Sequence, residues 1–110
     1  MRPGVVGSTV VDSGRIRHTV AFRLRHRPGS AEEAAFLVDA ESLGAIPGVE
    51  AFEILREVGE KNDFAFGISM EFADRAAYDG YNSHPDHVRF VDQRWAPEVA
   101  DFLEIDYAQR

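Results

Sequence analysis

The sequence of 110 residues contains no cysteine. Disulfide bonds, thiolate metal ligands and a cysteine nucleophile are therefore excluded. Long hydrophobic runs are also missing, because no stretch approaches the roughly 20 apolar residues that span a bilayer. The first residues contain no apolar segment of signal-peptide length. These absences favour a cytoplasmic location and predict no membrane partner.

Basic residues are in the minority, with 12 Lys and Arg against 19 Asp and Glu, which gives a formal net charge of -7. Such a chain repels a phosphate backbone unless its basic residues gather on one face. One group near the start of the chain consists of Arg15, Arg17, Arg23, Arg25 and Arg27. Their alternate spacing is typical of a solvated strand face, so we expect no nucleic-acid partner.

The composition supports one packed domain. Hydrophobic residues make up 45% of the chain and include eight Phe, which is enough for a core, while 110 residues leave no room for a second core. Residues 1–14 are rich in Gly, and we expect them to form a flexible N-terminal extension. Residues 15–110 are then the folded domain.

Hydrophobic periodicity predicts a strand followed by a helix. From residue 15 to residue 25 the chain alternates, and one face carries Ile16, His18, Val20, Phe22 and Leu24. His18 therefore lies on the apolar face. Ser30 and Glu33 match a capping box, in which each side chain satisfies a backbone donor of the other residue. A helix of about four turns should start at Ser30 and stop near Gly44, ahead of Pro47-Gly48.

The rest of the chain completes a recognisable order of elements. Residues 49–58 and 64–72 resemble two strands joined by a polar loop of hairpin length. Helices are expected after Asp74 and from Pro85, and residues 102–107 form a short last strand. The order β-α-β-β-α-α-β predicts a ferredoxin-like α+β subunit, with one antiparallel sheet and its helices on a single face.

The other face of this sheet would be bare. Its mid-strand residues are small or apolar, and they are Ala21, Ala51, Leu55, Ala65 and Gly67. A lone subunit would expose them as an apolar patch. Pairing with a second copy, face to face, would cover the patch, so the predicted partner is the chain itself as a homodimer.

The densest chemical signal is the segment His-Pro-Asp-His at residues 84–87. A proline fixes the start of a helix and places His87 one turn from His84, with Tyr81 just before them. The positive end of the helix dipole favours a neutral imidazole, the form that acts as a base near pH 7. His18 joins the group if the sheet packs under this helix. The alternative is that His84 only caps the helix and His18 is a hydrogen-bonded core residue.

Five segments, taken in this order, resemble the Dabb family of stress-responsive dimeric α/β barrels over about residues 15–108. They are His18-Thr-Val-Ala-Phe, Ile46-Pro-Gly-Val, Phe72-Ala-Asp, His84-Pro-x-His-x-x-Phe and Ile105-Asp-Tyr. The resemblance implies a ferredoxin-like subunit whose sheet pairs with a second copy to form a barrel. Many members are described only as stress-responsive. Plant polyketide cyclases that resemble them close a linear poly-β-keto thioester by aldol condensation, without a metal or organic cofactor.

The resemblance to these cyclases implies that His18, Tyr81 and His87 are catalytic, with His84 beside them. Phe36 stands where the cyclases have a Phe that lines the substrate cavity, although a Phe there could also simply fill the core. One turn later the cyclases have a Tyr where this chain has Asp39. Phe36, Asp39 and His84 are therefore candidates for substrate contacts, and no cofactor and no metal are expected.

Two main hypotheses follow. In the first, the protein is a cofactor-independent lyase or cyclase: His87 removes a proton next to a carbonyl, while Tyr81 and His18 hydrogen-bond to the developing enolate oxygen. In the second, it is a non-enzymatic dimer that binds a small apolar or polyketide-like ligand, or protects other proteins under stress. Weaker alternatives are a metal site built from His18, His84 and His87, and a haem-free or haem-degrading monooxygenase, although no residue argues specifically for oxygen chemistry.

Overall fold

The computed structural model describes residues 14–110, so the expected extension at residues 1–14 lies outside the described residues except for its last residue. The main elements are β1 (Ile16–Leu24), α2 (Ala31–Glu41), β2 (Glu50–Arg56), β3 (Phe66–Phe72), α3 (Arg75–Ser83), α4 (Pro85–Phe90) and β4 (Val99–Ala108). A 3₁₀ turn, η1 (Ser42–Ala45), follows α2, and a π-helical turn, η2 (Val91–Trp95), and α5 (Ala96–Glu98) follow α4. The predicted order β-α-β-β-α-α-β is confirmed.

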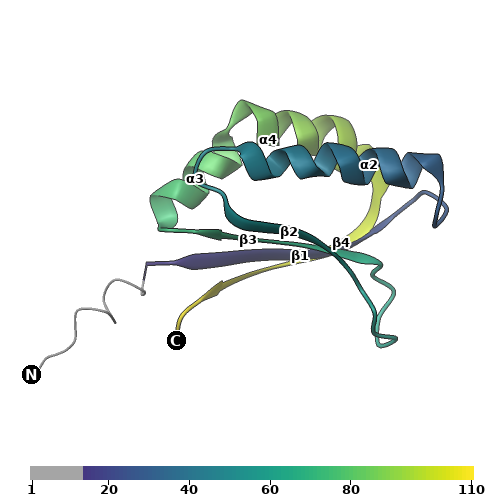
Figure 1. Cartoon of the computed structure of the whole chain (residues 1–110), viewed down its shortest axis with the longest axis horizontal. Helices are drawn as coiled ribbons and strands as arrows, with labels where there is room; N and C mark the ends of the chain where they lie inside the picture. The colour runs from purple at the N-terminus through teal and green to yellow at the C-terminus, as the bar shows by residue number, and fades with distance from the viewer. Residues whose placement is uncertain (1–13) are drawn as a thin grey trace, which may run out of the picture.

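The strands form one antiparallel sheet in the order β2-β3-β1-β4. The helices of the described residues all cover the same face of this sheet and leave its other face without a helix (Figure 1). This is the ferredoxin-like α+β fold that the sequence predicts. Because β4 is an edge strand, it pairs only with β1, and it frames one side of the space beneath the helices.

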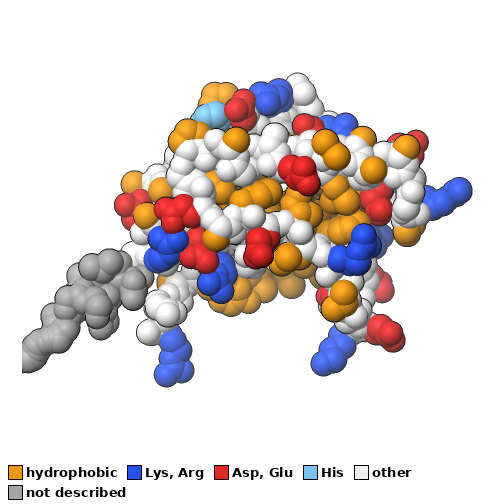
Figure 2. All heavy atoms as spheres, in the orientation of Figure 1, with side chains coloured by type: hydrophobic (Ala, Val, Ile, Leu, Met, Phe, Trp, Pro, Cys, Tyr) orange, Lys and Arg blue, Asp and Glu red, His pale blue; other side chains and the backbone are white. Residues whose placement is uncertain are grey.

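The core lies between the helices and the sheet, where Figure 2 shows hydrophobic side chains. Register places Val20 opposite Ile68 and Phe22 opposite Phe66 on the helix-facing side. Phe36 of α2 packs against Phe22 and is fully buried. The period of two in β1 is thus confirmed, and its apolar face is the one that the helices cover.

The N-terminus of α2 follows the capping prediction in part. The Ser30 hydroxyl accepts a hydrogen bond from the Glu33 amide at 3.1 Å, as expected. The Glu33 carboxylate instead accepts from the amide of Gly29 at 3.0 Å, one residue earlier than the capping box requires. The reason is that the Ser30 amide already donates to the Arg27 carbonyl at 3.1 Å in a tight turn.

Two segments near the C-terminus differ from the sequence expectation. β4 spans Val99–Ala108 rather than residues 102–107, because pairing with β1 continues past a bulge until Leu24 meets Val99. The helix from Pro85 reaches Trp95, but its part at Val91–Trp95 is a π-helical turn, which hydrophobic spacing does not reveal.

The helix-free face of the sheet, called here the open face, is small and apolar at its centre. Register places Ala21 between Gly67 and Leu103, and Ile105 follows Leu103 on the same face. Both β4 side chains are exposed, and Figure 2 shows hydrophobic side chains below the sheet. A Cβ on Gly67 would meet only the Val20 carbonyl at 3.7 Å, so residues 14–110 leave this small face uncovered.

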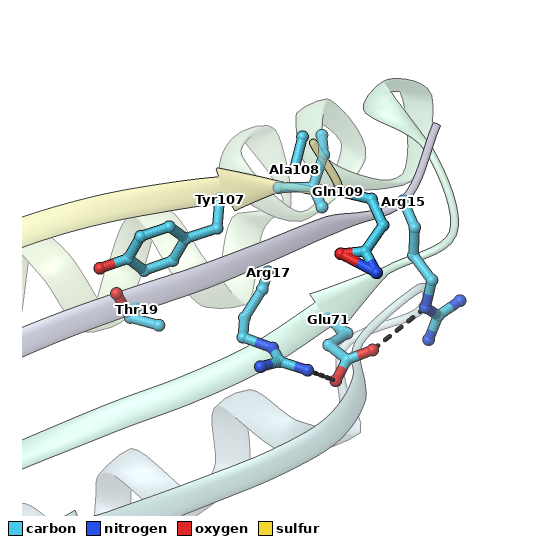
Figure 3. Close-up of a pocket in the computed structure, with 8 residues that line it drawn as sticks. Arg15, Arg17, Thr19, Glu71, Tyr107, Ala108 and Gln109 are labelled. Carbon is cyan, nitrogen blue, oxygen red and sulfur yellow. Dashed lines mark hydrogen bonds and ion pairs between the residues drawn. The ribbon is translucent and has the colours of Figure 1, made fainter. Parts of the chain in front are cut away.

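One end of the open face carries a hollow in which charges are paired. Arg15 and Arg17 flank Glu71 and donate hydrogen bonds to its two carboxylate oxygens at 3.1 and 3.0 Å (Figure 3). These bonds lower the pKa of Glu71, the one from Arg15 having the larger effect. Tyr107 and Thr19 also line the hollow (Figure 3). Two of the arginines expected on a strand face are therefore partly neutralised within the chain.

Within residues 14–110, every helix falls short of the length and apolar character that crossing a membrane requires.

Two glycines are expected to respond oppositely to substitution by alanine. Gly48 has φ +92°, a conformation that L-residues rarely adopt, and an added Cβ would lie 3.4 Å from the Cβ of Ala77. Gly80 lies in α3, and a Cβ added there would have no neighbouring atom within 4 Å. Gly48→Ala should lower the free energy of unfolding by about 1–2 kcal/mol, whereas Gly80→Ala should raise it by about 0.5–1 kcal/mol. Urea denaturation at one protein concentration checks both, and equal effects would contradict this account.

Candidate functional site

A cavity of about 280 Å³ lies between the sheet and the helical layer. Its polar lining residues are His18, Tyr81, His87 and Glu104. Its apolar lining residues are Val20, Leu43, Ile68, Met70, Phe90, Val91, Trp95 and Phe102. The structure therefore brings together all three residues that the resemblance implies as catalytic, and it places His18 and His87 on the same side of the sheet.

His18 is anchored by a carboxylate behind it. The imidazole is 5% exposed, and its Nδ1 lies 2.6 Å from Oδ1 of Asp106 on β4. The Tyr78 hydroxyl donates to the other oxygen of Asp106 at 2.7 Å. Burial and, next, the bond to Asp106 raise the pKa of Tyr78, so it remains a donor. A carboxylate facing Nδ1 holds a proton there, which leaves Nε2 of His18 to face the cavity.

His87 presents a base of defined tautomer. Its Nδ1 lies 3.0 Å from the backbone carbonyl of Asn82, and a carbonyl can only accept, so Nδ1 carries the proton. The remaining nitrogen, Nε2, is then the one with a free lone pair. Burial lowers the pKa of His87, although the Asn82 hydrogen bond acts in the opposite direction. The imidazole is thus neutral at pH 7, mainly because it is desolvated.

Tyr81 supplies a hydroxyl beside this base. Its side chain is 2% exposed, and its ring centroid lies 4.4 Å from that of His87. Burial raises the pKa of Tyr81, so the phenol stays protonated and can donate a hydrogen bond at any pH near neutral. The pair combines a proton acceptor and a proton donor within one largely apolar enclosure.

The three residues expected to contact substrate lie outside the lining of this cavity. His84 caps α4, where its Nδ1 accepts from the Asp86 amide at 3.1 Å, which is the alternative role considered for it. Phe36 is buried in the core against Phe90 and other rings. Asp39 is exposed on α2, and its carboxylate lies 3.3 Å from the Arg94 guanidinium of η2. Each of the three side chains thus has a structural contact within the protomer that explains its position without a ligand.

Sequence reasoning missed several lining residues, chiefly those of β4. Phe102 and Glu104 line the cavity, and Asp106 stands directly behind it. All three occupy alternate positions, so a strand assignment could have placed them on one face. Trp95 both packs against the core and lines the cavity.

A metal site built from the three histidines is not favoured by the geometry. No group of three His, Cys, Asp or Glu side chains is arranged to hold an ion within the part of the chain that the structure describes. His84 uses Nδ1 for its own helix and does not line the cavity that His18 and His87 share.

Comparison with known proteins identifies the architecture. The sequence model of the Dabb family, described as a stress responsive A/B barrel domain, matches residues 16–109. A Dabb family protein with a ferredoxin-like fold from Mesorhizobium loti has 60% sequence identity and a TM-score of 0.87, with 88% of this chain and 98% of that chain covered. No curated protein matches the chain.

Two more distant structures share the fold. A dimeric ferredoxin-like protein of unknown function from Thermobifida fusca has a TM-score of 0.74 at 21% identity, covering 88% of this chain and 92% of that one. A hydroxynitrile lyase from Passiflora edulis has a TM-score of 0.78 at 15% identity, covering 89% and 95%. At these identities the likeness shows a common fold alone.

The lowered pKa of His87 has a consequence for stability that can be measured. An imidazole whose pKa is depressed by folding adds nothing at high pH, where both states are neutral, and destabilises the fold as pH falls and the unfolded chain takes up a proton first. The wild type should therefore lose more unfolding free energy than His87→Gln between about pH 7.5 and about pH 5. Urea titrations across this range, with NMR titration of the His87 ring, provide the check. A His87 pKa at or above the ordinary 6.5 would contradict it.

Proposed function

We propose that this chain, which belongs to the Dabb family of stress-responsive α/β barrel domains, is a cofactor-independent lyase that acts next to a carbonyl group. One observation supports this most: a neutral imidazole of fixed tautomer, His87, and a protonated phenol, Tyr81, lie side by side in a small apolar cavity. A base and a hydrogen-bond donor placed together are the groups that enolate chemistry requires.

In the proposed aldol-type step, Nε2 of His87 takes a proton from the carbon next to a carbonyl. The electron pair of the broken C–H bond moves onto the carbonyl oxygen, where the Tyr81 hydroxyl stabilises the enolate. The enolate carbon then attacks a second carbonyl carbon, and the alkoxide that forms takes back the proton from His87. His18 can add a second donor at Nε2 only in its doubly protonated form, because Asp106 holds the proton at Nδ1. The atoms and electrons of this step balance without an oxidant or a cofactor.

The same groups suit a simpler cleavage. In an aldehyde cyanohydrin, His87 would take the hydroxyl proton, the carbonyl would re-form, and the C–C bond would break as cyanide leaves with the electron pair. A hydroxynitrile lyase shares the fold at 15% identity, which supports testing this reaction. Cyanohydrin cleavage and poly-β-keto thioester cyclisation are therefore the two assays with which to begin.

A second candidate function is binding without turnover. Most residues that line the cavity are apolar, and an apolar enclosure retains small apolar molecules whether or not chemistry follows. In that case His18 and His87 have a structural role, and the protein is a ligand-binding or stress-protective dimer. Loss of His87 would then affect stability rather than turnover.

We also propose that the protein is a homodimer whose two open faces meet. The exposed side chains of Leu103 and Ile105, together with the small strip around Ala21 and Gly67, form a surface that no other part of the described chain covers. Structures that share the fold are described as dimeric. An interface of this kind should bury roughly 2,000 Å² or more of total area.

The dimer has a direct mutational test. Ile105→Arg and Leu103→Arg introduce charge into the centre of the open face, so they should convert the dimer to a monomer of 12.3 kDa. Val38→Arg is the matched control, since Val38 is an exposed apolar residue on α2, away from the open face. Light scattering at micromolar concentration measures all three. A wild-type mass near 12.3 kDa would contradict the proposal.

The catalytic proposal is tested at His87. His87→Ala should leave the chain folded and reduce turnover of the cyanohydrin or the thioester by about 10²- to 10⁴-fold, because it removes the base. His26→Ala is the control, since His26 pairs with Glu98 outside the cavity and should leave turnover nearly unchanged. If wild type turns over neither substrate and His87→Ala costs about 1–3 kcal/mol of stability, the structural role is the correct one.

A further inference from the structure

The side chains in and around the cavity carry an excess of negative charge. Among the described residues that line it, Glu104 is the one Asp, Glu, Lys or Arg side chain. His87 is neutral, and the phenol of Tyr81 is protonated. The other imidazole of the lining, His18, already has Asp106 at 2.6 Å, so even its protonated form leaves Glu104 as a second carboxylate beside one imidazole. A largely apolar enclosure with an excess carboxylate discriminates between ligands by their charge.

Glu104 stands at the mouth of the cavity rather than deep inside it. Register places it opposite Val20, so it faces the helices as Asp106 does, two residues along β4. Its side chain is 55% exposed, whereas that of His18 is 6% exposed. A ligand whose apolar part fills the cavity would therefore have one end beside His18 and the other within reach of this carboxylate.

The oxygens of Glu104 are available to a ligand, unlike those of Asp106. Both Asp106 oxygens accept hydrogen bonds, one from His18 and one from Tyr78. The Glu104 carboxylate accepts no side-chain hydrogen bond among the described residues, and its Oε2 lies 3.6 Å from Nε2 of His18, an ion-pair distance only when that imidazole is protonated. The charge of Glu104 nevertheless affects the site. It adds to the larger effect of burial in raising the pKa of Tyr81, and it opposes the larger effect of burial, which lowers the pKa of His87.

We propose that Glu104 sets the charge specificity of the cavity: it binds the hydrogen-bond donor of a small apolar ligand, most favourably an ammonium group, and it rejects anions. The ligand class is a small apolar amine or, more weakly, an alcohol. This deepens the proposed function and rests on one part of it, namely that the cavity is a ligand site. It does not depend on turnover, so the two can fail separately.

The chain provides its own reporter for this binding. Trp95 is the only tryptophan in the sequence, and it lines the cavity. Its fluorescence should change when the cavity fills. Benzylamine, benzyl alcohol and benzoate share one aromatic ring and differ in charge, so titrating each of them isolates the contribution of Glu104.

Wild-type protein should bind benzylamine most tightly, benzyl alcohol less tightly and benzoate most weakly. Glu104→Gln keeps the shape of the side chain and removes its charge, so it should weaken benzylamine binding by about 5- to 30-fold and strengthen benzoate binding. The alcohol should change little. Glu60→Gln is the matched control, because Glu60 is exposed in the loop between β2 and β3, and benzylamine binding should stay within about twofold.

Each outcome decides a different point. If wild type binds the three compounds equally, or if Glu104→Gln keeps the preference for benzylamine while circular dichroism shows it folded, the inference about Glu104 is overturned and the lyase proposal stands. If wild type binds none of them, both the inference and the ligand cavity behind the proposed function are overturned. Preference for the amine without any turnover supports Glu104 and leaves the binding function in place of the lyase.

Discussion

The cavity depends on the carboxylate of Asp106. It accepts hydrogen bonds from His18 on β1 and from Tyr78 on α3, so one side chain on an edge strand joins the sheet to the helical layer. A buried imidazole and a buried phenol are costly without partners, and this carboxylate satisfies both. Because each oxygen is already engaged, His18 is held in one orientation with Nε2 toward the cavity. The side of the cavity at His18 is therefore ordered by contacts within the chain and needs no ligand to form.

Much of the fold could be predicted because its signals are local. The alternation through β1 identifies the buried face without reference to any other strand, and Ser30 marks the start of α2 by its own hydroxyl. His18, Tyr81 and His87 could be placed together because His18 shares the apolar face of β1, which the helix at Pro85 has to cover. In each case the deciding interaction lies within a few residues or follows from one strand's period.

The contribution of β4 could not be read from the sequence in the same way. Leu103 and Ile105 are more apolar than Glu104 and Asp106. Hydrophobicity alone would therefore assign Leu103 and Ile105 to the buried, helix-facing side of β4, although they are exposed. Pairing with β1 decides the matter, since it fixes which alternate set faces the helices. Phe36 illustrates the same limit on a helix: the residue type suits a cavity wall or a core, and only the rotation of α2 against the sheet places it in the core.

The paired charges around Glu71 bear on how the open face could meet a copy of itself. In a twofold interface every residue approaches the same surface of the other subunit, so an unbalanced charge on one copy meets its own sign on the other. Arg15 and Arg17 would bring two such charges. Glu71 binds both guanidinium groups within its own chain, and Glu50 binds Arg15 as well, so two carboxylates balance two guanidinium groups. In the proposed dimer this end of each face would therefore be neutral before the two copies meet, and the fit between the subunits would depend on shape.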